Sequence, residues 1–270
     1  MIGSKKDWIF VSDAHFTGRE PEPMEAFLRF LDSEKKRIGH LVILGDLFEF
    51  FFSFRKGSTA GKSAAFSDYL PVLNKLQTLH REGIQIKYFE GNHDFFLQPF
   101  FSEQFGMEIE VYPSGCEERL EGNRAFIAHG DLSNPRQWAY RAFRRILKNP
   151  LTYRLIQLAG PRISCGVAGK WSSLSFQKNH HQRQSHPLPA FKAFAHQKFL
   201  EGFEIVILGH SHFPEAVEEW IDGRRRLYYN PGDWAVHRSF LRFSPPDRFE
   251  LERYNESETA TRRSGDTGIG

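Results

Sequence analysis

Cysteine and long apolar runs are scarce in this chain, and acidic residues are missing from one long stretch. Only two cysteines, Cys116 and Cys165, occur among 270 residues, which excludes a disulfide-rich secreted scaffold and favours a reducing compartment such as the cytoplasm. No run of about 18 apolar residues exists, so we expect no segment to span a membrane. Residues 1–7 are polar and lead straight into a predicted strand, which is not the pattern of a signal peptide.

The absence of acidic residues is confined to residues 132–200. This block holds 12 Lys or Arg and no Asp or Glu, whereas the whole chain has 36 basic and 33 acidic residues. Its charge predicts attraction to phosphate-bearing substrates, anionic lipid surfaces or polyanions. The block lacks strand patterns, and helical spacing occurs over Arg136 to Leu147 and Thr152 to Leu158. We therefore expect a basic helical insertion between two core strands, not a separately folding domain.

The remaining residues, 1–131 and 201–255, have the pattern of an α/β core with a sheet of mixed character. Strands alternate with helices early in the chain and cluster later. Helices are predicted over Met24 to Arg37 and Ser67 to Glu82. Strands are predicted at Trp8 to Val11, His40 to Leu44, Ile84 to Phe89, Arg124 to Ala128, Glu204 to Leu208, Arg226 to Tyr229, Ser239 to Phe243 and Arg248 to Tyr254. The polar tail, residues 256–270, is predicted to be disordered.

Five of these strands are followed directly by carboxylate, imidazole or amide side chains. Ligands of α/β sheets bind beyond the carboxyl ends of strands, so we expect the five segments to meet at one site. Each segment alone is explained as well by a turn or a surface pair, but the occurrence of all five in order favours a shared site. They are Asp13-Ala14-His15, Gly45-Asp46, Gly91-Asn92-His93-Asp94, His129-Gly130-Asp131 and Gly209-His210-Ser211-His212.

The chemistry of these side chains points to metal ions. Imidazoles, carboxylates and one amide oxygen, without a thiolate, suit Mn, Fe or Zn and argue against a structural cysteine site. The candidates are too many for one tetrahedral ion, whereas two ions sharing a bridging carboxylate would use them all. Two ions about 4 Å apart can hold both the attacking and the leaving oxygen of a phosphoryl transfer. The candidate ligands are Asp13, His15, Asp46, Asn92, His129, His210 and His212.

In this order the five segments resemble the motifs of the calcineurin-like metallophosphoesterases. The family pattern is D-x-H, G-D-x-x-[DE], G-N-H-[DE], H-G-[DH] and G-H-x-H, and all five are intact here, within about residues 8–254. The resemblance implies a four-layer α/β/β/α sandwich with an inserted helical lid. It also implies that Asp46 bridges two divalent ions. One ion would be held by Asp13, His15 and His212. The other would be held by Asn92, His129 and His210.

The resemblance further implies catalytic roles for His93 and Asp94. His93 would not be a ligand but would donate to the phosphate or the leaving oxygen, and Asp94 would orient it. An imidazolium in that place can supply a proton and offset charge on the phosphoryl oxygens. The attacking group would be a water made acidic by both ions.

Other features resemble one subfamily, the UDP-2,3-diacylglucosamine hydrolases of lipid A synthesis. Phe50-Phe51-Phe52 follows the second motif, a helical insertion follows the fourth, and Gly232-Asp233-Trp234 lies near the end. Such enzymes cleave the pyrophosphate of a lipid-linked nucleotide, releasing UMP and a lipid monophosphate, usually with Mn²⁺, and their insertion holds the acyl chains. For this chain that implies a lid over residues 132–200 and a peripheral location on the anionic inner face of the cytoplasmic membrane. No obligate protein partner is evident.

Within the basic block, six polar residues are candidates for contact with phosphate or glucosamine, although a single residue of this kind more often belongs to a solvated face. They are Arg141, Lys170, Ser172, Ser173, Ser175 and Lys178. The chain departs from the subfamily at His93, where known members have Arg, and at Arg136-Gln137, where an acidic pair is expected. A phosphodiesterase or phosphatase acting on another nucleotide or lipid phosphate therefore stays open. Nucleic-acid binding is disfavoured by the apolar helical stripes of the block, and a non-catalytic scaffold by the intact motifs.

Overall fold

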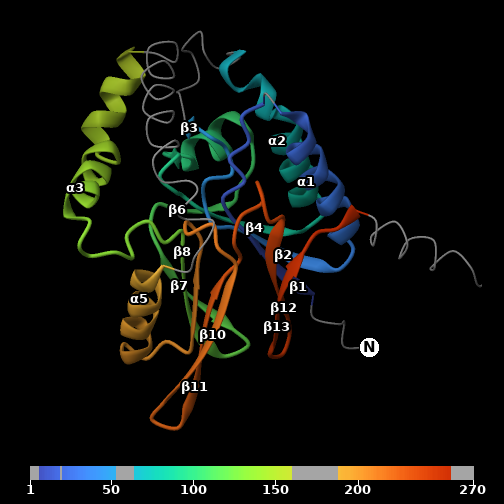
Figure 1. Cartoon of the computed structure of the whole chain (residues 1–270). Coiled ribbons are helices and arrows are strands. Elements are labelled where there is room, and N and C mark those ends of the chain that lie inside the picture. Colours follow the sequence, from blue (N-terminus) through green and yellow to red (C-terminus); the bar gives the residue numbers. More distant parts are fainter. Residues whose placement is uncertain (1–5, 19, 53–63, 160–187, 257–270) are drawn as a thin grey trace, which may run out of the picture.

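The computed structural model describes residues 6–18, 20–52, 64–159 and 188–256, and two large sheets face each other in it (Figure 1). The first sheet has a parallel part, β1, β2, β4 and β6, and an antiparallel edge in which β12 pairs with β1. Its strands, in spatial order, are β13 (Arg248–Arg253), β12 (Ser239–Ser244), β1 (Asp7–Val11), β2 (Ile38–Ile43), β4 (Gln85–Phe89) and β6 (Glu110–Tyr112).

The second sheet has three parallel strands, β11, β9 and β8, between two antiparallel edges. In spatial order its strands are β10 (Glu215–Ile221), β11 (Arg224–Asn230), β9 (Ile205–Leu208), β8 (Asn123–Ala128) and β7 (Cys116–Leu120). A separate pair of very short parallel strands, β3 (Phe51–Phe52) and β5 (Asp94–Phe95), lies above the two sheets (Figure 1).

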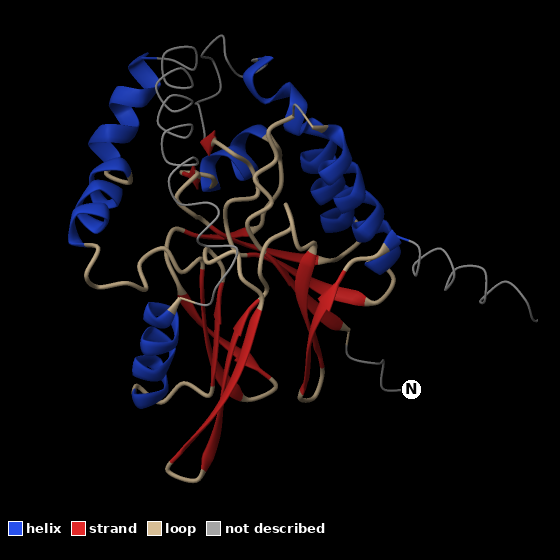
Figure 2. Ribbon diagram, in the orientation of Figure 1, coloured by secondary structure: helices blue, strands red, loops and turns tan. Residues whose placement is uncertain are grey.

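Helices cover the outer face of each sheet, which gives four layers (Figure 2). Helices α1 (Pro21–Glu34) and α2 (Leu70–Arg81) cover the first sheet, and the 3-10 turn η1 (Ala64–Tyr69) leads into α2. Helix α5 (Pro189–Leu200) covers the second sheet through Phe191, Ala195 and Phe199. A π-helical turn, η2, spans Phe100–Gln104. The expected α/β/β/α sandwich is confirmed.

The alternation of side chains along the strands explains why both faces of the first sheet are buried. In β1, Ile9 and Val11 pack under the helices, whereas Phe10 points the other way and packs against the second sheet. Ile205 and Ile207 of β9 meet it from the opposite side. The sequences of these strands are therefore continuous runs of apolar residues, as is usual in a sheet that is covered on both faces.

Two parts of the expected insertion are described, and they contact the core in different ways. Helix α3 (Trp138–Leu147) and a second helical stretch at residues 150–159 lie to one side of the sandwich (Figure 1). Arg144 of α3 and Lys148, which follows it, form ion pairs with Asp131 and Glu90. Helix α5, although it falls within the expected insertion, belongs to the outer layer of the sandwich.

Several elements were not predicted from the sequence, namely β3, β5, β6, β7 and β10. At the other end of the chain, Glu256 is placed and accepts a hydrogen bond from Arg29 Nε at 2.9 Å, although the expected tail began at this residue. Residues 257–270, the rest of that tail, lie outside the described residues.

Candidate metal centre

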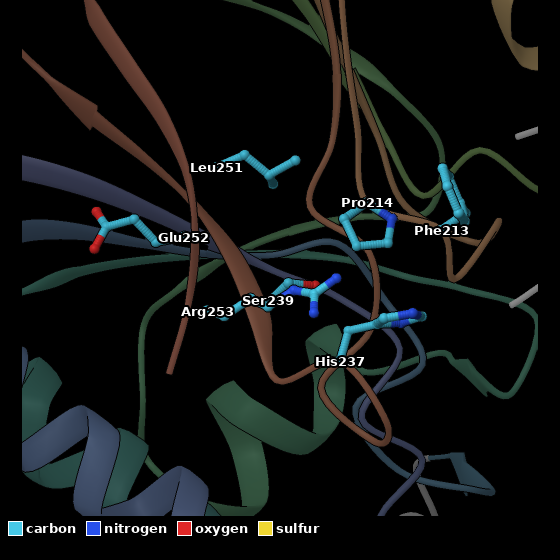
Figure 3. A pocket seen from close by; sticks show the side chains of 7 residues that line it. All are labelled: Phe213, Pro214, His237, Ser239, Leu251, Glu252 and Arg253. Atoms are coloured by element: carbon cyan, nitrogen blue, oxygen red, sulfur yellow. The ribbon is translucent and has the colours of Figure 1, made fainter. Parts of the chain in front are cut away.

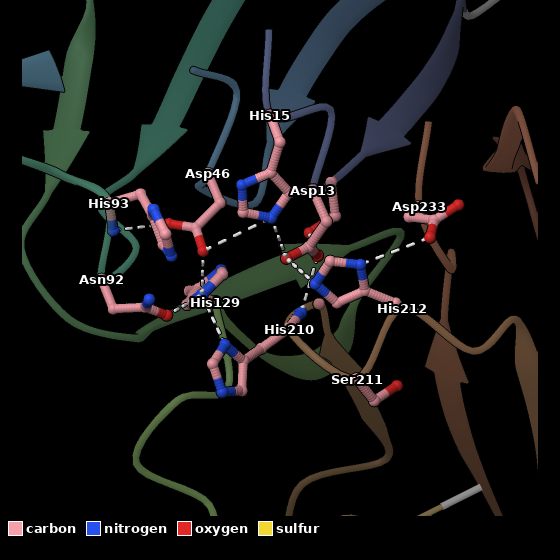
Figure 4. Close-up of polar contacts among 12 residues, drawn as sticks. Asp13, His15, Asp46, Asn92, His93, His129, His210, Ser211, His212 and Asp233 are labelled. Atoms are coloured by element: carbon pink, nitrogen blue, oxygen red, sulfur yellow. Dashed lines mark hydrogen bonds and ion pairs between the residues drawn. The ribbon is translucent and has the colours of Figure 1, made fainter. Parts of the chain in front are cut away.

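The strand ends named from the sequence meet at one place between the two sheets (Figure 4). The first sheet contributes the residues that follow β1, β2 and β4, and the second contributes those that follow β8 and β9. The structure brings together all the candidate ligands: Asp13, His15, Asp46, Asn92, His129, His210 and His212. The five segments therefore converge in the structure, as expected from the sequence.

The donor atoms of the candidate ligands form two overlapping groups, and a third group of nearby atoms joins His15 to Glu49 and His93. One ligand atom each from Asp13, His15 and His212 lies within 4.8 Å of the others, and the same is true of Asp13, Asp46, His129 and His210. We call Asp13, His15 and His212 the first group. Asn92 adds an amide oxygen to the other side, because its Oδ1 lies 3.2 Å from His129 Nε2. We call Asn92, His129 and His210 the second group.

Asp46 lies between the two groups. Its Oδ2 is 3.4 Å from His129 Nε2 and 4.0 Å from His15 Nε2, so one oxygen faces an imidazole of each group. Its other oxygen, Oδ1, accepts a hydrogen bond from the backbone N–H of His93 at 2.9 Å. A hydrogen bond thus holds one oxygen of the carboxylate, and the other oxygen faces both groups, which is the arrangement that a bridging ligand would need.

The backbone at this site is strained. Asp13, His15, Asp46, His210 and His212 have φ angles of 53°, 47°, 52°, 65° and 59°, a region that non-glycine residues rarely occupy. Such conformations cost about 1–3 kcal/mol each and persist where the surrounding structure enforces them. Here the backbone N–H of His15 donates to the carbonyl of Asp46 at 3.0 Å, which ties two of the strained turns together.

Gly91 lets the backbone pass beside Asp46. A Cβ atom built on Gly91 would lie 2.0 Å from Asp46 Oδ1, so any side chain there would displace the carboxylate. Gly45 has a φ of 87°, and a Cβ at this position would lie 2.7 Å from His129 Nδ1. The glycines of these two motifs are therefore required by the close approach of the loops.

The charges of the cluster favour cations. Burial alone would raise the pKa of Asp13 and Asp46, but the neighbouring imidazoles, led by His212 for Asp13 and His129 for Asp46, lower both below the usual range. Burial likewise lowers the pKa of His129, yet Asp46 and Asp13 outweigh it and raise that pKa to about 9. Contacts with Asp13 and Glu49 raise the pKa of His15 against the same burial. The buried carboxylates thus favour the protonated form of the nearby imidazole rings. A metal ion can take the place of these protons.

The residues present fit divalent metal ions. Among the described residues, Asp13 Oδ1 is buried and accepts no hydrogen bond, although a buried carboxylate oxygen normally does so. His129 Nδ1 lies 2.6 Å from the carbonyl oxygen of Leu44 and therefore carries a proton, so Nε2, which faces Asp46 and Asn92, is the ring nitrogen that an ion would bind in place of its own proton. Oxygen and imidazole donors without thiolate suit Mn, Fe or Zn.

His93 lies at the margin of the cluster and is only partly buried (Figure 4). Its Nδ1 is 2.7 Å from the carbonyl oxygen of Glu49, so Nδ1 carries the proton and Nε2 is the ring nitrogen outside this contact. Its ring lies edge-on to that of His15, with centroids 4.9 Å apart.

Asp94 has other neighbours than expected. Its Oδ2 accepts hydrogen bonds from Tyr88 Oη at 2.6 Å and from the backbone N–H of Leu47 at 3.2 Å, and its Oδ1 accepts one from the N–H of Gly91 at 2.5 Å. Burial, followed by the charge of Asp46, raises the pKa of Asp94 to about 7. Because these donors engage both oxygens, Asp94 fixes the loop that carries His93, while the ring of His93 is oriented by Glu49.

Two carboxylates of the cluster were not assigned from the sequence. Glu49 Oε2 lies 3.3 Å from His15 Nδ1, and Asp233 Oδ2 lies 3.3 Å from His212 Nδ1. Glu49 closes the Gly45–Glu49 motif, and Asp233 follows the end of β11 as the other site residues follow their strands. Both signals were visible in the sequence, but the partner of each carboxylate depends on the course of the loops.

Only one of the six candidates in the basic block lies within the described residues. Arg141 Nη1 donates to the carbonyl of Leu132 at 2.6 Å, which anchors the start of α3 to the loop after β8. Lys170, Ser172, Ser173, Ser175 and Lys178 lie outside the described residues.

A cavity of about 200 Å³ lies beside the cluster, lined by Phe213, Pro214, His237, Ser239, Leu251, Glu252 and Arg253 (Figure 3). It is linked to the cluster through His237, whose Nδ1 is 3.1 Å from Asp233 Oδ1. None of the candidate ligands lines it, so the cavity does not mark the place of the chemistry.

Comparisons with known proteins agree with this geometry. A family model described as calcineurin-like phosphoesterase matches residues 9–214. The UDP-2,3-diacylglucosamine hydrolase of Aeromonas salmonicida is 29% identical over 250 residues, which cover 89% of this chain and 91% of that protein. The enzyme of the same name from Tolumonas auensis is 29% identical over 248 residues, covering 88% and 94%. A solved structure of Vps29 with Zn²⁺ from Entamoeba histolytica aligns with a TM-score of 0.41 and 14% identity, covering 92% of this chain and 98% of that one. The chain therefore belongs to the calcineurin-like phosphoesterase family, and it is a hydrolase.

Proposed function

We propose that this protein hydrolyses the pyrophosphate of UDP-2,3-diacylglucosamine, releasing UMP and a diacylglucosamine 1-phosphate. The observation that carries the proposal is the pairing of two Asp/His groups across Asp46 in a chain whose relatives bear the name of that hydrolase. The first group would hold one divalent ion and the second group the other, with Asp46 between them. Mn²⁺ is the metal we expect, with Fe or Zn as alternatives.

Two ions, when bound, supply Lewis acidity that makes a water a stronger nucleophile and offsets charge on the phosphoryl oxygens. The protein's own residues do the rest. Asp46 fixes the spacing of the two groups, and the strained turns after β1, β2 and β9 aim the donors inward. His93 presents Nε2 to the ester, where it can donate to the leaving oxygen once protonated. Asp94 keeps the loop of His93 in place through its contacts with Tyr88 and Gly91.

An apolar surface next to the loop of His93 supports a lipid substrate. Phe52 of β3 and Phe95 of β5 form a buried aromatic cluster, against which Ile156 of the second helical stretch packs. Phe96 also contacts the ring of Tyr153, with centroids 4.5 Å apart. Beyond this cluster the same helices expose large apolar side chains, namely Trp138, Phe143, Ile146, Leu151, Leu155 and Leu158. Exposed apolar patches of this kind mark lipid or partner contacts.

This surface, together with the basic residues of the block, would place the enzyme on an anionic membrane. We propose a peripheral position on the inner face of the cytoplasmic membrane, with the insertion acting as a lid that holds the acyl chains. No helix among the described residues is long and apolar enough to cross a bilayer.

The test is incubation of the metal-loaded enzyme with UDP-2,3-diacylglucosamine and, in parallel, with UDP-N-acetylglucosamine, which lacks both long acyl chains. We expect UMP from the diacylated compound at a kcat/KM at least about 100-fold higher, since burial of an acyl chain contributes about 0.8 kcal/mol per methylene. Equal turnover of both compounds would favour a phosphodiesterase of soluble nucleotides. The absence of UMP at enzyme concentrations that cleave a generic phosphodiester would refute the substrate.

A further inference from the structure

Three polar side chains form a row along helix α3 and the residue that ends it. Tyr140, Arg144 and Lys148 are spaced four residues apart, which places them on one face of the helix. Tyr140 Oη donates to Asp131 Oδ2 at 2.7 Å, and Arg144 forms an ion pair with the same carboxylate. At the end of the row, Lys148 Nζ lies 3.2 Å from Glu90 Oε2. The row therefore contacts the core through two carboxylates, which belong to different loops.

Each of these carboxylates lies two residues from a ligand of the second group. Asp131 follows His129 by two positions in the loop after β8, and Glu90 precedes Asn92 by two positions in the loop after β4. His129 Nε2 and Asn92 Oδ1 are 3.2 Å apart, so the two loops meet at the second group (Figure 4). The ligands of the first group follow β1 and β9 instead. Helix α3 thus contacts the loops that present two of the three ligands of the second group.

The contacts are shielded from water and supported by further hydrogen bonds. Glu90 is 4% exposed, and the side chain of Lys148 is 12% exposed. Glu90 Oε1 accepts a hydrogen bond from the backbone N–H of Leu97 at 2.8 Å. The carbonyl oxygen of Pro113 accepts one from Arg144 Nη2 at 3.1 Å and one from Lys148 Nζ at 3.3 Å. Buried pairs whose hydrogen bonds are satisfied hold one geometry, whereas ion pairs in water contribute little.

We propose that α3 supports the metal centre, and that Arg144 and Lys148 hold the loops of His129 and Asn92 in the geometry that binds the second ion. The proposal rests on the two-ion site of the proposed function. Arg144 and Lys148 are then positioning residues, which act on the ligand loops without touching the ion. The loss of such outer contacts weakens metal binding by about 10–100-fold.

Charge and positioning predict opposite effects for the removal of Lys148, which makes the proposal testable. Lys148→Met removes a positive charge near the centre, and by charge alone a cation should then bind more tightly. If Lys148 positions the loop of Asn92, the variant should bind the second ion about tenfold more weakly. Arg144→Met should act in the same direction through Asp131.

The experiment is calorimetric titration of the metal-free full-length chain with Mn²⁺, without substrate. The natural protein should bind two ions, and Lys148→Met should bind one of them as tightly as before and the other about tenfold more weakly. Asn92→Ala removes a donor of the second group alone, so the ion that it still binds reports on the first group. Adding Lys148→Met to Asn92→Ala should leave the affinity for that remaining ion unchanged.

Two further variants make the result specific. Lys75→Met removes a lysine of α2 that is similarly shielded, at 16% exposed, and that pairs with Asp32 of α1 at 2.7 Å. It should bind both ions as the natural protein does. Lys148→Met combined with Glu90→Gln removes both charges and leaves no carboxylate unpaired, so this double variant should fold even where the single one does not. It should still bind the second ion about tenfold more weakly. Each variant is first checked for an unchanged circular dichroism spectrum.

Three outcomes would overturn the inference while the two-ion site stands. They are unchanged or tighter binding of both ions in Lys148→Met, natural affinity in the double variant, and weaker binding of the remaining ion when Lys148→Met is added to Asn92→Ala. Binding of fewer than two ions by the natural protein would instead refute the two-ion site. Because no substrate is present, an error in the proposed substrate would leave these results unchanged.

Discussion

At the scale of single residues, the site depends on Asp46 more than on any other side chain. It is the residue whose one oxygen faces imidazoles of both groups, at 3.4 and 4.0 Å. We predict that Asp46→Ala loses both ions and lowers phosphodiester hydrolysis by about 10³-fold or more, since both ions lose their shared donor. Metal analysis of the purified variant, together with its rate on a generic phosphodiester, checks this. Retention of two ions at full occupancy would contradict a bridging role.

His93 gives the complementary prediction. Its ring contacts the Glu49 carbonyl and faces His15 edge-on, and only its backbone N–H contacts Asp46. His93→Ala should therefore keep both ions and lower kcat by about 10²–10⁴-fold, the usual contribution of a positioned acid. Paired measurements of metal content and kcat decide the point. Loss of an ion in this variant would show that His93 is a ligand.

Cys116 provides a test of the electrostatics away from the metal centre. Burial, then the charge of Glu118, raises the pKa of its thiol from 9.0 to about 11. Since a raised pKa means less thiolate, alkylation by iodoacetamide at pH 8 should be about 100-fold slower than for a thiol of ordinary pKa. The rate should climb tenfold per pH unit up to about pH 11. Mass spectrometry of a Cys165→Ser variant isolates this thiol, and a plateau below pH 9 would refute the shift.

At the scale of elements, the described helical part of the insertion forms ion pairs with the core through two basic side chains and exposes several large apolar ones. Arg144 and Lys148 are occupied by Asp131 and Glu90, so they act as anchors and are not free to bind an anionic surface. The outward side chains carry the proposed lipid contacts, since Ile146 is 62% and Leu155 58% exposed.

This arrangement predicts an effect that depends on the substrate. Ile146→Glu or Leu155→Glu should raise the KM for the diacylated substrate about tenfold, because losing one apolar contact costs about 1.5 kcal/mol. Hydrolysis of a soluble phosphodiester should stay unchanged, since neither side chain supports the core. Trp220→Glu, on an equally exposed aromatic of the β10–β11 hairpin, serves as the control. Equal KM values for all three variants would refute the lipid surface.

The elements also show where sequence reasoning reached its limit. Strands with continuous apolar runs, such as β1 and β9, were predictable because burial on both faces leaves a strong signal. The two-residue strands β3 and β5 were not, because they exist only through each other: Phe51 pairs with Asp94, and no local pattern encodes that contact. The strand β10 has the partly buried, alternating sequence of an edge, in which Glu215 and Glu219 give little apolar signal.

At the site, residue identities were predictable and partners were not. The motifs named the side chains that converge, because carboxylates and imidazoles directly after strands meet in this kind of fold. Glu49 behind His15 and the turn of Asp94 toward Tyr88 depend on loop paths set by left-handed residues such as Asp13 and Asp46. Such conformations are imposed by tertiary contacts and leave no periodic trace in the sequence.

At the scale of the whole molecule, the centre joins the two sheets, so ions should stabilise the fold as well as the chemistry. Saturation at 100 times the Kd contributes about 2.7 kcal/mol per ion that binds only the folded state. For a protein of this size we expect removal of Mn²⁺ by EDTA to lower the Tm by about 5–10 °C per site. Scanning calorimetry with and without the chelator measures the shift. An unchanged Tm would mean that no ion bridges the sheets.

The donors come from both ends of the chain, from Asp13 after the first strand to His212 after the ninth. During synthesis, a chain that has emerged only as far as His129 carries five of the seven candidate ligands and lacks both His210 and His212. Each of the two proposed ion sites then lacks one imidazole, so we expect no hydrolysis by the growing polypeptide. We therefore expect reactivity toward phosphate esters to require the docking of β9 beside β8, which brings His210 and His212 to the other candidate ligands.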